Sequence, residues 1–332
     1  MRAFIKVLAC HLPEGRLSNA DLEREFPEWS PEKIQAKVGI NTRRIAAADE
    51  TATDLAERAA RKLFDRYGVE AVAIDYLLFC TQGPDYFLPA SACLLQDCLG
   101  LPIHTGALDI VMGCSGYIYG LSLAKGLLAA GIASNVLLLT ADTFSRYLHP
   151  KDKASRSILG DGAGATLIAG EGFTEIGEFC LGTDGSGAEN LIVRTGGARS
   201  RGLSHALEWD DYGTPVSPDH FYMNGGEIYS FTLRRVPALV EQTLQKNKVA
   251  QNDIDLFVFH QANGYMLEQL RKKIKIDVDK FFVNLSEVGN TTSSSMPIAL
   301  CEALEKGKIQ KDSKTLLAGF GVGLSWGGCV LT

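Results

Sequence analysis

Short apolar runs alternate along the chain with longer segments whose apolar residues recur at helical spacing. The short runs have the length of buried strands, and the longer segments have the length of helices. Strands and helices that alternate in this way build βαβ units, in which helices cover both faces of a mostly parallel sheet. The pattern predicts an α/β protein with strands at 71–80, 135–140, 165–169, 254–259 and 315–317, and helices at 52–67, 116–130, 226–246, 265–273 and 295–306.

Part of this pattern occurs twice. Segments 74–79 and 254–259 look alike, and the aspartate that each carries in second place recurs after 180 residues. Two more pairs of landmarks lie 179 and 176 residues apart, namely Leu137 with Leu316 and Cys114 with Asn290. A nearly constant offset predicts a duplicated fold with halves 1–171 and 172–332, although apolar strands also resemble one another by chance. The same offset places Cys80 and His260 at the ends of equivalent strands, where α/β sheets bind ligands.

One long segment follows neither period. Residues 194–221 are polar, rich in glycine and without a clear repeat. A loop of this length inside a compact domain is usually functional or mobile. We interpret it as a surface excursion that flanks a pocket.

Composition and charge narrow the class of protein. The chain has 332 residues, of which 46% are hydrophobic, so it can bury a large core without disulfides. The net charge of −6 argues against a nucleic-acid binder, and no apolar run approaches the roughly 18–20 residues of a membrane span. The N-terminal residues 1–7 alternate like a strand and do not resemble a secretory signal. Eight scattered cysteines without a CxxC pair favour a reducing cytosol, so we predict a cytoplasmic protein.

Cys114 lies at a predicted turn between a strand and a helix, within the sequence Gly113-Cys114-Ser115-Gly116. The field of a helix N-terminus lowers the pKa of a thiol and favours the nucleophilic thiolate. Cysteine is also among the most frequently buried residue types, so a structural role is the alternative.

His260 and Asn290 are two candidate partners for this thiol. His260 follows a buried strand, and Asn290 occupies a Gly-Asn turn before a helix. Each residue type often has a merely structural role at such places. Together with Cys114 they fit two chemistries. In a papain-like hydrolase, Asn orients His and His activates Cys; in a condensing enzyme, Cys carries an acyl group while His and Asn donate hydrogen bonds to a second thioester.

Motifs along nearly the whole chain resemble those of β-ketoacyl-acyl-carrier-protein synthase III, a family of the thiolase superfamily. The resemblance implies a five-layered αβαβα fold built from two similar halves, and a homodimer. It favours the condensing chemistry over the papain-like one, whose cysteine normally comes near the mature N-terminus. The matching motifs are Leu12-Pro13, 19–23, Gly39-Ile40, 113–116, 160–165, 223–225, 260–263, 289–291 and 319–327.

The resemblance also implies roles for single residues. Cys114 is the acylated nucleophile, and His260 and Asn290 are the donors that assist decarboxylation. The backbone N–H groups of Cys114 and Gly323 form the oxyanion hole. The remaining substrate-binding positions are Leu88, which reaches the acyl pocket of the partner subunit, and Gly225, Asn263 and Phe320 near the substrate channel.

The coenzyme A site departs from the family pattern. Lys33 and Lys37 stand where the family has the Trp and Arg that hold the nucleotide, and Lys153, with Arg156 nearby, replaces another Arg. Positive charge is kept at Lys37, Lys153 and Arg156, whereas the aromatic stacking surface is lost. The glycine runs do not match GxGxxG or a P-loop, so we expect tight turns beside the active site instead of a nucleotide site.

These observations predict a decarboxylating Claisen condensation of an acyl thioester with malonyl-acyl carrier protein through an acyl-Cys114 intermediate. The donor is an acyl-CoA or an acyl carrier protein, so coenzyme A or phosphopantetheine thioesters are substrates, and no metal or redox cofactor is required. An acidic carrier protein is expected to dock on basic clusters that include Arg234, Arg235, Lys272 and Lys273, although such clusters are also ordinary solvated surface. The alternatives are acyl transfer to oxygen or nitrogen, thioester hydrolysis, and a non-enzymatic partner subunit.

Overall fold

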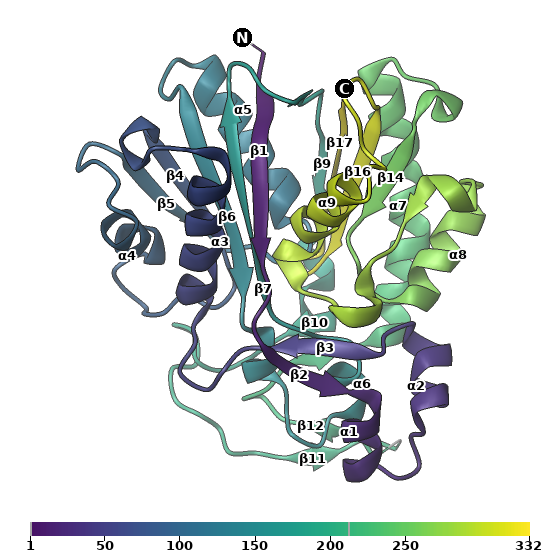
Figure 1. The fold of residues 1–332 in the computed structure, drawn as a ribbon. Helices are drawn as coiled ribbons and strands as arrows, with labels where there is room; N and C mark the ends of the chain where they lie inside the picture. Colours follow the sequence, from purple (N-terminus) through teal and green to yellow (C-terminus); the bar gives the residue numbers. More distant parts are fainter. Residues whose placement is uncertain (1, 212) are drawn as a thin grey trace.

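Two β-sheets with the same strand order form the frame of the molecule (Figure 1). The structure is a computed structural model that describes residues 2–211 and 213–332. Met1 of the predicted N-terminal strand and Tyr212 of the 194–221 segment lie outside the described residues. In each sheet three parallel strands are followed by antiparallel ones.

The order of the first sheet is β5-β4-β6-β7-β1-β8, and the order of the second is β15-β14-β16-β17-β9. The strands of the first sheet are β1 (Phe4–His11), β4 (Tyr76–Cys80), β5 (Gly106–Ile110), β6 (Asn135–Asp142), β7 (Gly162–Ala169) and β8 (Thr174–Glu175). Those of the second are β9 (Cys180–Thr183), β14 (Leu256–Phe259), β15 (Phe281–Phe282), β16 (Thr315–Gly321) and β17 (Ser325–Leu331).

Helices fill three layers around the two sheets (Figure 1). Helices α3 (Ala52–Tyr67) and α4 (Ser91–Cys98) cover the outer face of the first sheet, and α7 (Gly225–Asn247) and α8 (Gly264–Ile274) cover that of the second. Helices α5 (Gly116–Ala129) and α9 (Ser295–Glu305) lie between the sheets. The predicted five-layered αβαβα architecture is confirmed.

Strand residues alternate between the layers, as the pleat of a sheet requires. Leu77 of β4 packs in the outer cluster beneath α3, whereas Leu78 packs in the central cluster. In the second sheet, Leu316 and Leu317 of β16 divide in the same way. Both faces of each sheet are therefore buried, which explains why the strands are almost continuously apolar in sequence.

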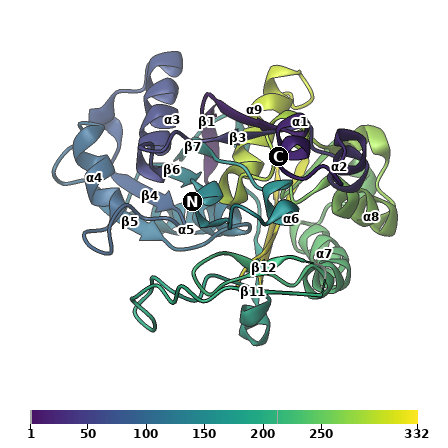
Figure 2. The ribbon, with the colours of Figure 1, turned by 90° about the horizontal axis from the view of Figure 1, so that it is seen from below.

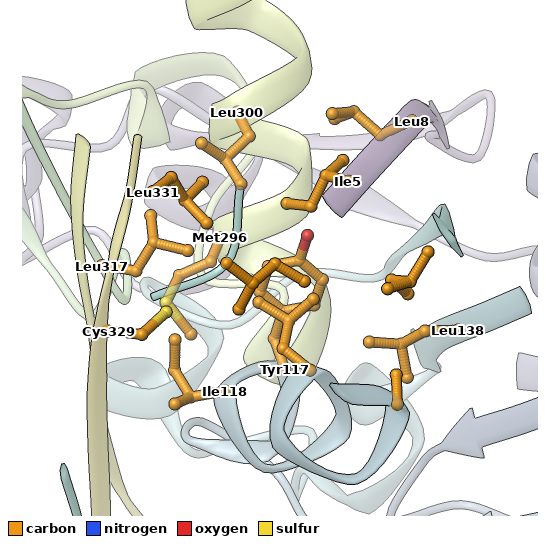
Figure 3. Packing of buried hydrophobic residues seen from close by; sticks show 14 of the residues in the cluster. Ile5, Leu8, Tyr117, Ile118, Leu138, Met296, Leu300, Leu317, Cys329 and Leu331 are labelled. Atoms are coloured by element: carbon orange, nitrogen blue, oxygen red, sulfur yellow. The ribbon is translucent and has the colours of Figure 1, made fainter. Parts of the chain in front are cut away.

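The central layer is where the two halves of the molecule meet (Figure 3). Tyr117 and Ile118 of α5 belong to the same buried cluster as Met296 of α9. Leu138 of β6 and Leu317 of β16 line that cluster from the two sheets. Burial of an apolar side chain of this size contributes about 1.5–3 kcal/mol, so the shared core fixes α5 and α9 against each other.

The two aspartates of the sequence repeat perform the same structural task. Asp75 precedes β4 and accepts hydrogen bonds from the backbone N–H groups of Ser134 and Asn135, at 2.8 and 3.0 Å, where β6 begins. Asp255 precedes β14 and accepts one from the N–H of Lys314, at 2.8 Å, just before β16. Each carboxylate thus anchors the neighbouring strand of its own sheet.

The boundary between residues 171 and 172 stays a prediction. The structure shows that β8 pairs with β1 in the first sheet, although it lies beyond residue 171. A further segment of the first half, α1 (Asn19–Glu25) and α2 (Pro31–Val38), packs in the cluster of the second sheet. This segment connects to the rest of the chain through the hairpin of β2 (Gly15–Ser18) and β3 (Thr42–Ile45).

Most predicted elements agree with the structure to within a few residues. The 52–67 helix is confirmed exactly, and Thr51 with Asp54 forms a capping box at its start. The predicted 71–80 strand begins later, because 3-10 turn η1 (Ala71–Ala73) precedes β4. The predicted 315–317 strand continues to Gly321.

The glycine runs form strands more than turns, contrary to expectation. Gly162 and Gly164 lie within β7, and Gly319 and Gly321 lie within β16. An added Cβ at Gly319 would lie 2.9 Å from the Cα of Ser115, so a side chain there would push the start of α5 away. These glycines allow strands and the central helix to approach closely.

The 194–221 segment forms an excursion at the end of the molecule where β2 and β3 lie (Figures 1 and 2). It contains a hairpin of β11 (Glu208–Trp209) and β12 (Pro215–Val216). The short strands β10 (Leu191–Ile192) and β13 (Tyr222–Met223) pair where the excursion leaves and rejoins the body. None of the helices in the described part of the chain combines the length and apolarity that a membrane crossing requires.

Candidate active site

Cys114, His260 and Asn290 line one cavity at the carboxyl ends of the central parallel strands. Its volume is about 70 Å³, which is small beside the roughly 300–1,000 Å³ of most ligand pockets. Other residues that line it are Gln82, Phe144, Ser155, Ile158, Leu159, Leu191, Phe221, Met223, Ile228, Thr232, Ala262, Asn263, Met266, Thr292, Phe320, Gly321 and Val322.

The Cys114 thiol lies just before α5 and receives hydrogen bonds from two backbone N–H groups, its own and that of Val322. These bonds lower its pKa, but burial is the larger effect and raises the pKa to about 11. The expectation of a lowered pKa is therefore wrong for this structure, because desolvation outweighs the favourable dipoles. An added Cβ at Gly321 would lie 2.6 Å from the Cys114 Sγ, so only glycine leaves the thiol open.

His260 follows β14 directly and is only 2% exposed. Its Nδ1 lies 2.7 Å from the Oγ of Ser295, and its ring meets the ring of Phe320 edge to face at 5.7 Å. Burial lowers the pKa of His260 to about 3, against a smaller opposing effect of a hydrogen bond with the Thr292 backbone. The imidazole is consequently neutral at physiological pH and carries a single N–H.

Asn290 is held by both its side chain and its backbone. Its Oδ1 accepts the N–H of Thr292 at 2.9 Å, and its Nδ2 donates to the carbonyl of Ala262 at 3.2 Å. Its backbone bridges to the segment before β7, through Ile158 and Gly160, with two bonds of 2.9 Å. One N–H of the amide remains available to a ligand in the cavity.

The structure brings only some of the other predicted substrate residues to this cavity. Phe320 and Asn263 line it, and Asn263 also caps α8 through the N–H of Met266. Gly323 and Gly225 are not among the lining residues, and Gly225 opens α7. Val322, which the sequence motifs did not single out, directs its backbone N–H at the Cys114 thiol, and the role expected of Gly323 stays a prediction.

Comparisons with known proteins agree on one family. The family model of 3-oxoacyl-acyl-carrier-protein synthase III matches residues 108–185, and the model of its C-terminal part matches residues 244–332. The β-ketoacyl-acyl-carrier-protein synthase III of Chlamydia caviae is 38% identical over 340 residues, which cover 99% of this chain and 96% of that protein. The chain belongs to the β-ketoacyl-acyl-carrier-protein synthase III family. It is thus an acyltransferase of the condensing-enzyme type that serves fatty-acid biosynthesis.

Solved structures give the same result. One 3-oxoacyl-acyl-carrier-protein synthase III superimposes with a TM-score of 0.97 at 50% identity and covers 100% of this chain and 99% of that chain. The enzyme from Thermus thermophilus superimposes with a TM-score of 0.87 at 34% identity, covering 99% of this chain and 98% of that chain. The predicted thiolase-like fold of this synthase III chain is confirmed.

Two of the basic residues expected at the coenzyme A site of this synthase III lie against one aromatic ring. Lys37 Nζ lies 5.2 Å from the centre of the Trp29 ring, and Lys153 Nζ lies 6.0 Å from it. Trp29, four residues earlier than Lys33, thus provides an aromatic ring beside two of these lysines, and the expected loss of the stacking surface at Lys33 itself stays a prediction. Lys153 also bonds to Glu28 at 2.7 Å, and Arg156 bonds to Glu25 through both of its terminal nitrogens.

The predicted docking residues differ in their exposure and in the contacts of their side chains. Lys272 and Lys273 of α8 and Arg234 of α7 are exposed, and Lys272 pairs with Glu268 at 3.3 Å. Arg235 is half-buried and stacks on Trp326 at 5.1 Å. Within residues 2–211 and 213–332, no group of three or more His, Cys, Asp or Glu side chains is placed to hold a metal ion.

Proposed function

We propose that this protein condenses an acyl thioester with malonyl-acyl carrier protein through an acyl group carried on Cys114. The observation that supports this most directly is that one cavity contains a thiol with two backbone N–H donors and two neutral side-chain donors. In the first step Cys114 attacks the acyl thioester, and the donor thiol leaves with a proton. The N–H groups of Cys114 and Val322 stabilise the oxyanion of the tetrahedral intermediate, which forms on attack and collapses when the donor thiol leaves.

His260 and Asn290 act in the second step. The malonyl thioester loses its carboxylate as carbon dioxide, and the electron pair remains as an enolate whose oxygen accepts hydrogen bonds from both side chains. The enolate attacks the acyl group, a carbon–carbon bond forms, and the Cys114 thiolate is released. A neutral imidazole suits this task, because it donates a proton in a hydrogen bond without the cost of burying a full charge.

His260 Nδ1 and the Ser295 Oγ lie 2.7 Å apart, and this oxygen also accepts the backbone N–H of Gln261 at 3.4 Å. We assign the Ser295 hydroxyl as the donor to Nδ1, which places the hydrogen of the neutral imidazole on Nε2. This is the tautomer that a donor to the enolate requires.

A coenzyme A thioester is the proposed acyl donor. The Trp29 ring offers a stacking surface for an adenine, and Lys37 is an exposed cation beside it. Lys153 and Arg156 complete the basic surroundings, although Glu28 and Glu25 compensate their charge. Lys37 is therefore the cation best placed to bind phosphate.

The acyl carrier protein is proposed to dock on exposed cations of α7 and α8. Arg234, Lys272 and Lys273 offer positive charge to an acidic partner. Arg235, which is packed on Trp326, contributes less than expected.

A homodimer is proposed from the open edge of the first sheet. In the described chain, β5 pairs with β4 on one side and with no strand on the other. Phe87 and Leu88 are 74% and 75% exposed, and Val111 just beyond β5 is also exposed. Apolar side chains beside a free strand edge favour association with a second copy.

Intact mass spectrometry with a panel of acyl-CoA and acyl-carrier donors tests the proposed reaction. The protein should gain one acyl group, and malonyl-carrier should then discharge it with release of carbon dioxide. Cys114→Ala should abolish labelling, and Asn290→Ala should slow carbon dioxide release more than acylation. Labelling that survives Cys114→Ala contradicts the role of the thiol, and discharge without carbon dioxide favours acyl transfer or hydrolysis.

A further inference from the structure

A buried carboxylate that the proposed reaction does not use lies beside the active site. Asp142 is the last residue of β6, is 1% exposed and lies behind the cavity. Burying an ionised carboxylate is costly unless donors surround it. The hydrogen-bond partners of Asp142 therefore indicate which segments this carboxylate holds in place.

The two carboxylate oxygens of Asp142 bind different halves of the molecule. Oδ1 accepts the backbone N–H of Gln82 at 2.8 Å and the hydroxyl of Thr81 at 3.3 Å, both from the segment after β4. Oδ2 accepts the hydroxyl of Thr292, the hydroxyl of Ser293 at 2.6 Å and the backbone N–H of Ser293 at 3.4 Å. Asp142 thus ties the first sheet to the turn that follows Asn290.

Thr292, which is bound by Asp142, also contacts the two proposed donors, Asn290 and His260. Its φ of +51° is a conformation that β-branched residues rarely adopt, so contacts around it must hold it there. In this conformation its N–H binds the Oδ1 of Asn290 at 2.9 Å, which turns the Asn290 amide so that its N–H groups face Ala262 and the cavity. The Thr292 backbone also bonds to His260.

We propose that Asp142 is a positioning residue that, through Thr292, holds Asn290 and His260 in the geometry needed for decarboxylation. The proposal rests on the roles given to Asn290 and His260 above. It predicts that loss of the Asp142–Thr292 bond affects the second step of the reaction and not the first. Acylation uses the Cys114 thiol and two backbone N–H groups that lie outside the 290–293 turn, and loss of the Asp142 charge, a minor cause of the raised Cys114 pKa, would favour the thiolate and not slow this step.

Separate assays of the two half-reactions test whether Asp142 affects decarboxylation and not acylation. Acylation is followed by intact mass with whichever acyl-CoA labels the unaltered protein, and decarboxylation by carbon dioxide release from malonyl-carrier. Asp142→Asn should keep acylation within about 3-fold while slowing carbon dioxide release at least about 10-fold, because misplaced catalytic groups cost about that much or more. Asp75→Asn, which alters a carboxylate on the other end of β4, is the control and should change neither rate.

Thr292 supplies a matched pair of variants that keeps the test valid if Asp142→Asn folds poorly. Thr292→Val removes the hydroxyl at constant shape and should slow carbon dioxide release like Asp142→Asn. Thr292→Ser retains the hydroxyl and should restore most of the rate. Equal slowing of both half-reactions, or full activity of Thr292→Val, overturns the proposal. If Asn290→Ala itself leaves carbon dioxide release unchanged, the role of Asn290 fails instead.

The pH dependence of carbon dioxide release distinguishes a positioning role of Asp142 from a simple loss of packing, which would not change this dependence. Burial raises the pKa of Asp142 to about 6 despite its hydrogen bonds, so the network should weaken as pH falls through that value. The groups around it are the thiols of Cys80 and Cys114 and the Tyr147 phenol, whose pKa values are all raised above their usual values, with the Arg146 guanidinium beside that phenol. Carbon dioxide release should fall below about pH 6 in the unaltered protein. This fall should be absent in Asp142→Asn, and its persistence there contradicts the proposal.

Discussion

At the scale of single residues, the reactivity of Cys114 is decided by what surrounds its sulfur. The helix N-terminus and two backbone N–H groups favour the thiolate, whereas burial favours the thiol and prevails. The free enzyme therefore holds its nucleophile mostly protonated. Binding of a thioester must supply the remaining activation.

This balance predicts the pH dependence of the thiol. Because the pKa of Cys114 is raised to about 11, its thiolate fraction should rise about tenfold per pH unit between pH 7 and 10. Iodoacetamide alkylation of Cys114, read by peptide mass, should follow that rise, with the exposed Cys93 as an internal reference. A plateau below pH 8 would show that the helix dipole dominates after all.

Gly321 controls access to the same sulfur. Gly321→Ala would place a methyl group 2.6 Å from Sγ, at a φ of +155° that disfavours a side chain. We expect acylation to fall about 100-fold or more, as for other misplacements in an active site. Gly126→Ala in α5, where an added Cβ meets no atom within 4 Å, is the control and should keep full activity. Normal acylation of Gly321→Ala would show that the thiol moves away from β16.

At the scale of elements, the sequence repeat corresponds to equivalent strands with equivalent anchors. The segments after β4 and β14 both lead to the cavity, one through Gln82 and the other through His260. Asp75 and Asp255 hold the strand next to each of them. The two sheets thus share this frame and differ in the residues at their strand ends.

Substitution of these two aspartates should have graded effects on stability. Asp255→Ala removes one hydrogen bond and should lower the free energy of unfolding by about 1 kcal/mol. Asp75→Ala removes two and should cost about twice as much. Urea denaturation measures both values. A larger loss for Asp255→Ala than for Asp75→Ala would contradict equivalent roles for the two carboxylates.

At the scale of the whole molecule, the proposed dimer and the carrier surface lie on different elements and can be tested separately. Leu88→Asp places a charge in the exposed apolar group beside β5. We expect sedimentation velocity to show a monomer for this variant and a dimer for the unaltered protein. An unchanged sedimentation coefficient would remove Leu88 from the interface.

Binding of the carrier protein to α8 should depend on the positive charge of this helix. Reversal of Lys272 and Lys273 to Glu should raise the KM for malonyl-carrier several-fold without changing acylation by an acyl-CoA, because like charges then face an acidic partner. Lys6→Glu and Lys311→Glu, two exposed lysines outside α8, are the charge-matched control. Equal KM values in both double variants would exclude docking at α8.

Several features of this protein followed from its sequence alone, because they depend on neighbours along the chain. Helix α3 was predicted to the residue, since Thr51 and Asp54 cap it and its apolar spacing is regular. The apolar runs predicted most of the buried strands, and their repeat at 180 residues predicted two equivalent sheets. Strand β17 was not predicted, because its paired glycines carry little strand propensity.

Other features were decided only when distant segments met in space. Which backbone N–H faces the Cys114 sulfur depends on how the turn after β16 lies against the start of α5, and in the structure Val322 supplies one of them. The raised pKa of that thiol and the neutral state of His260 come from burial beneath both halves. Asp142 reaches Thr292 across 150 positions of sequence. The sequence thus identifies the candidate catalytic residues. Their protonation states and orientations depend on desolvation and on hydrogen bonds that only tertiary packing creates.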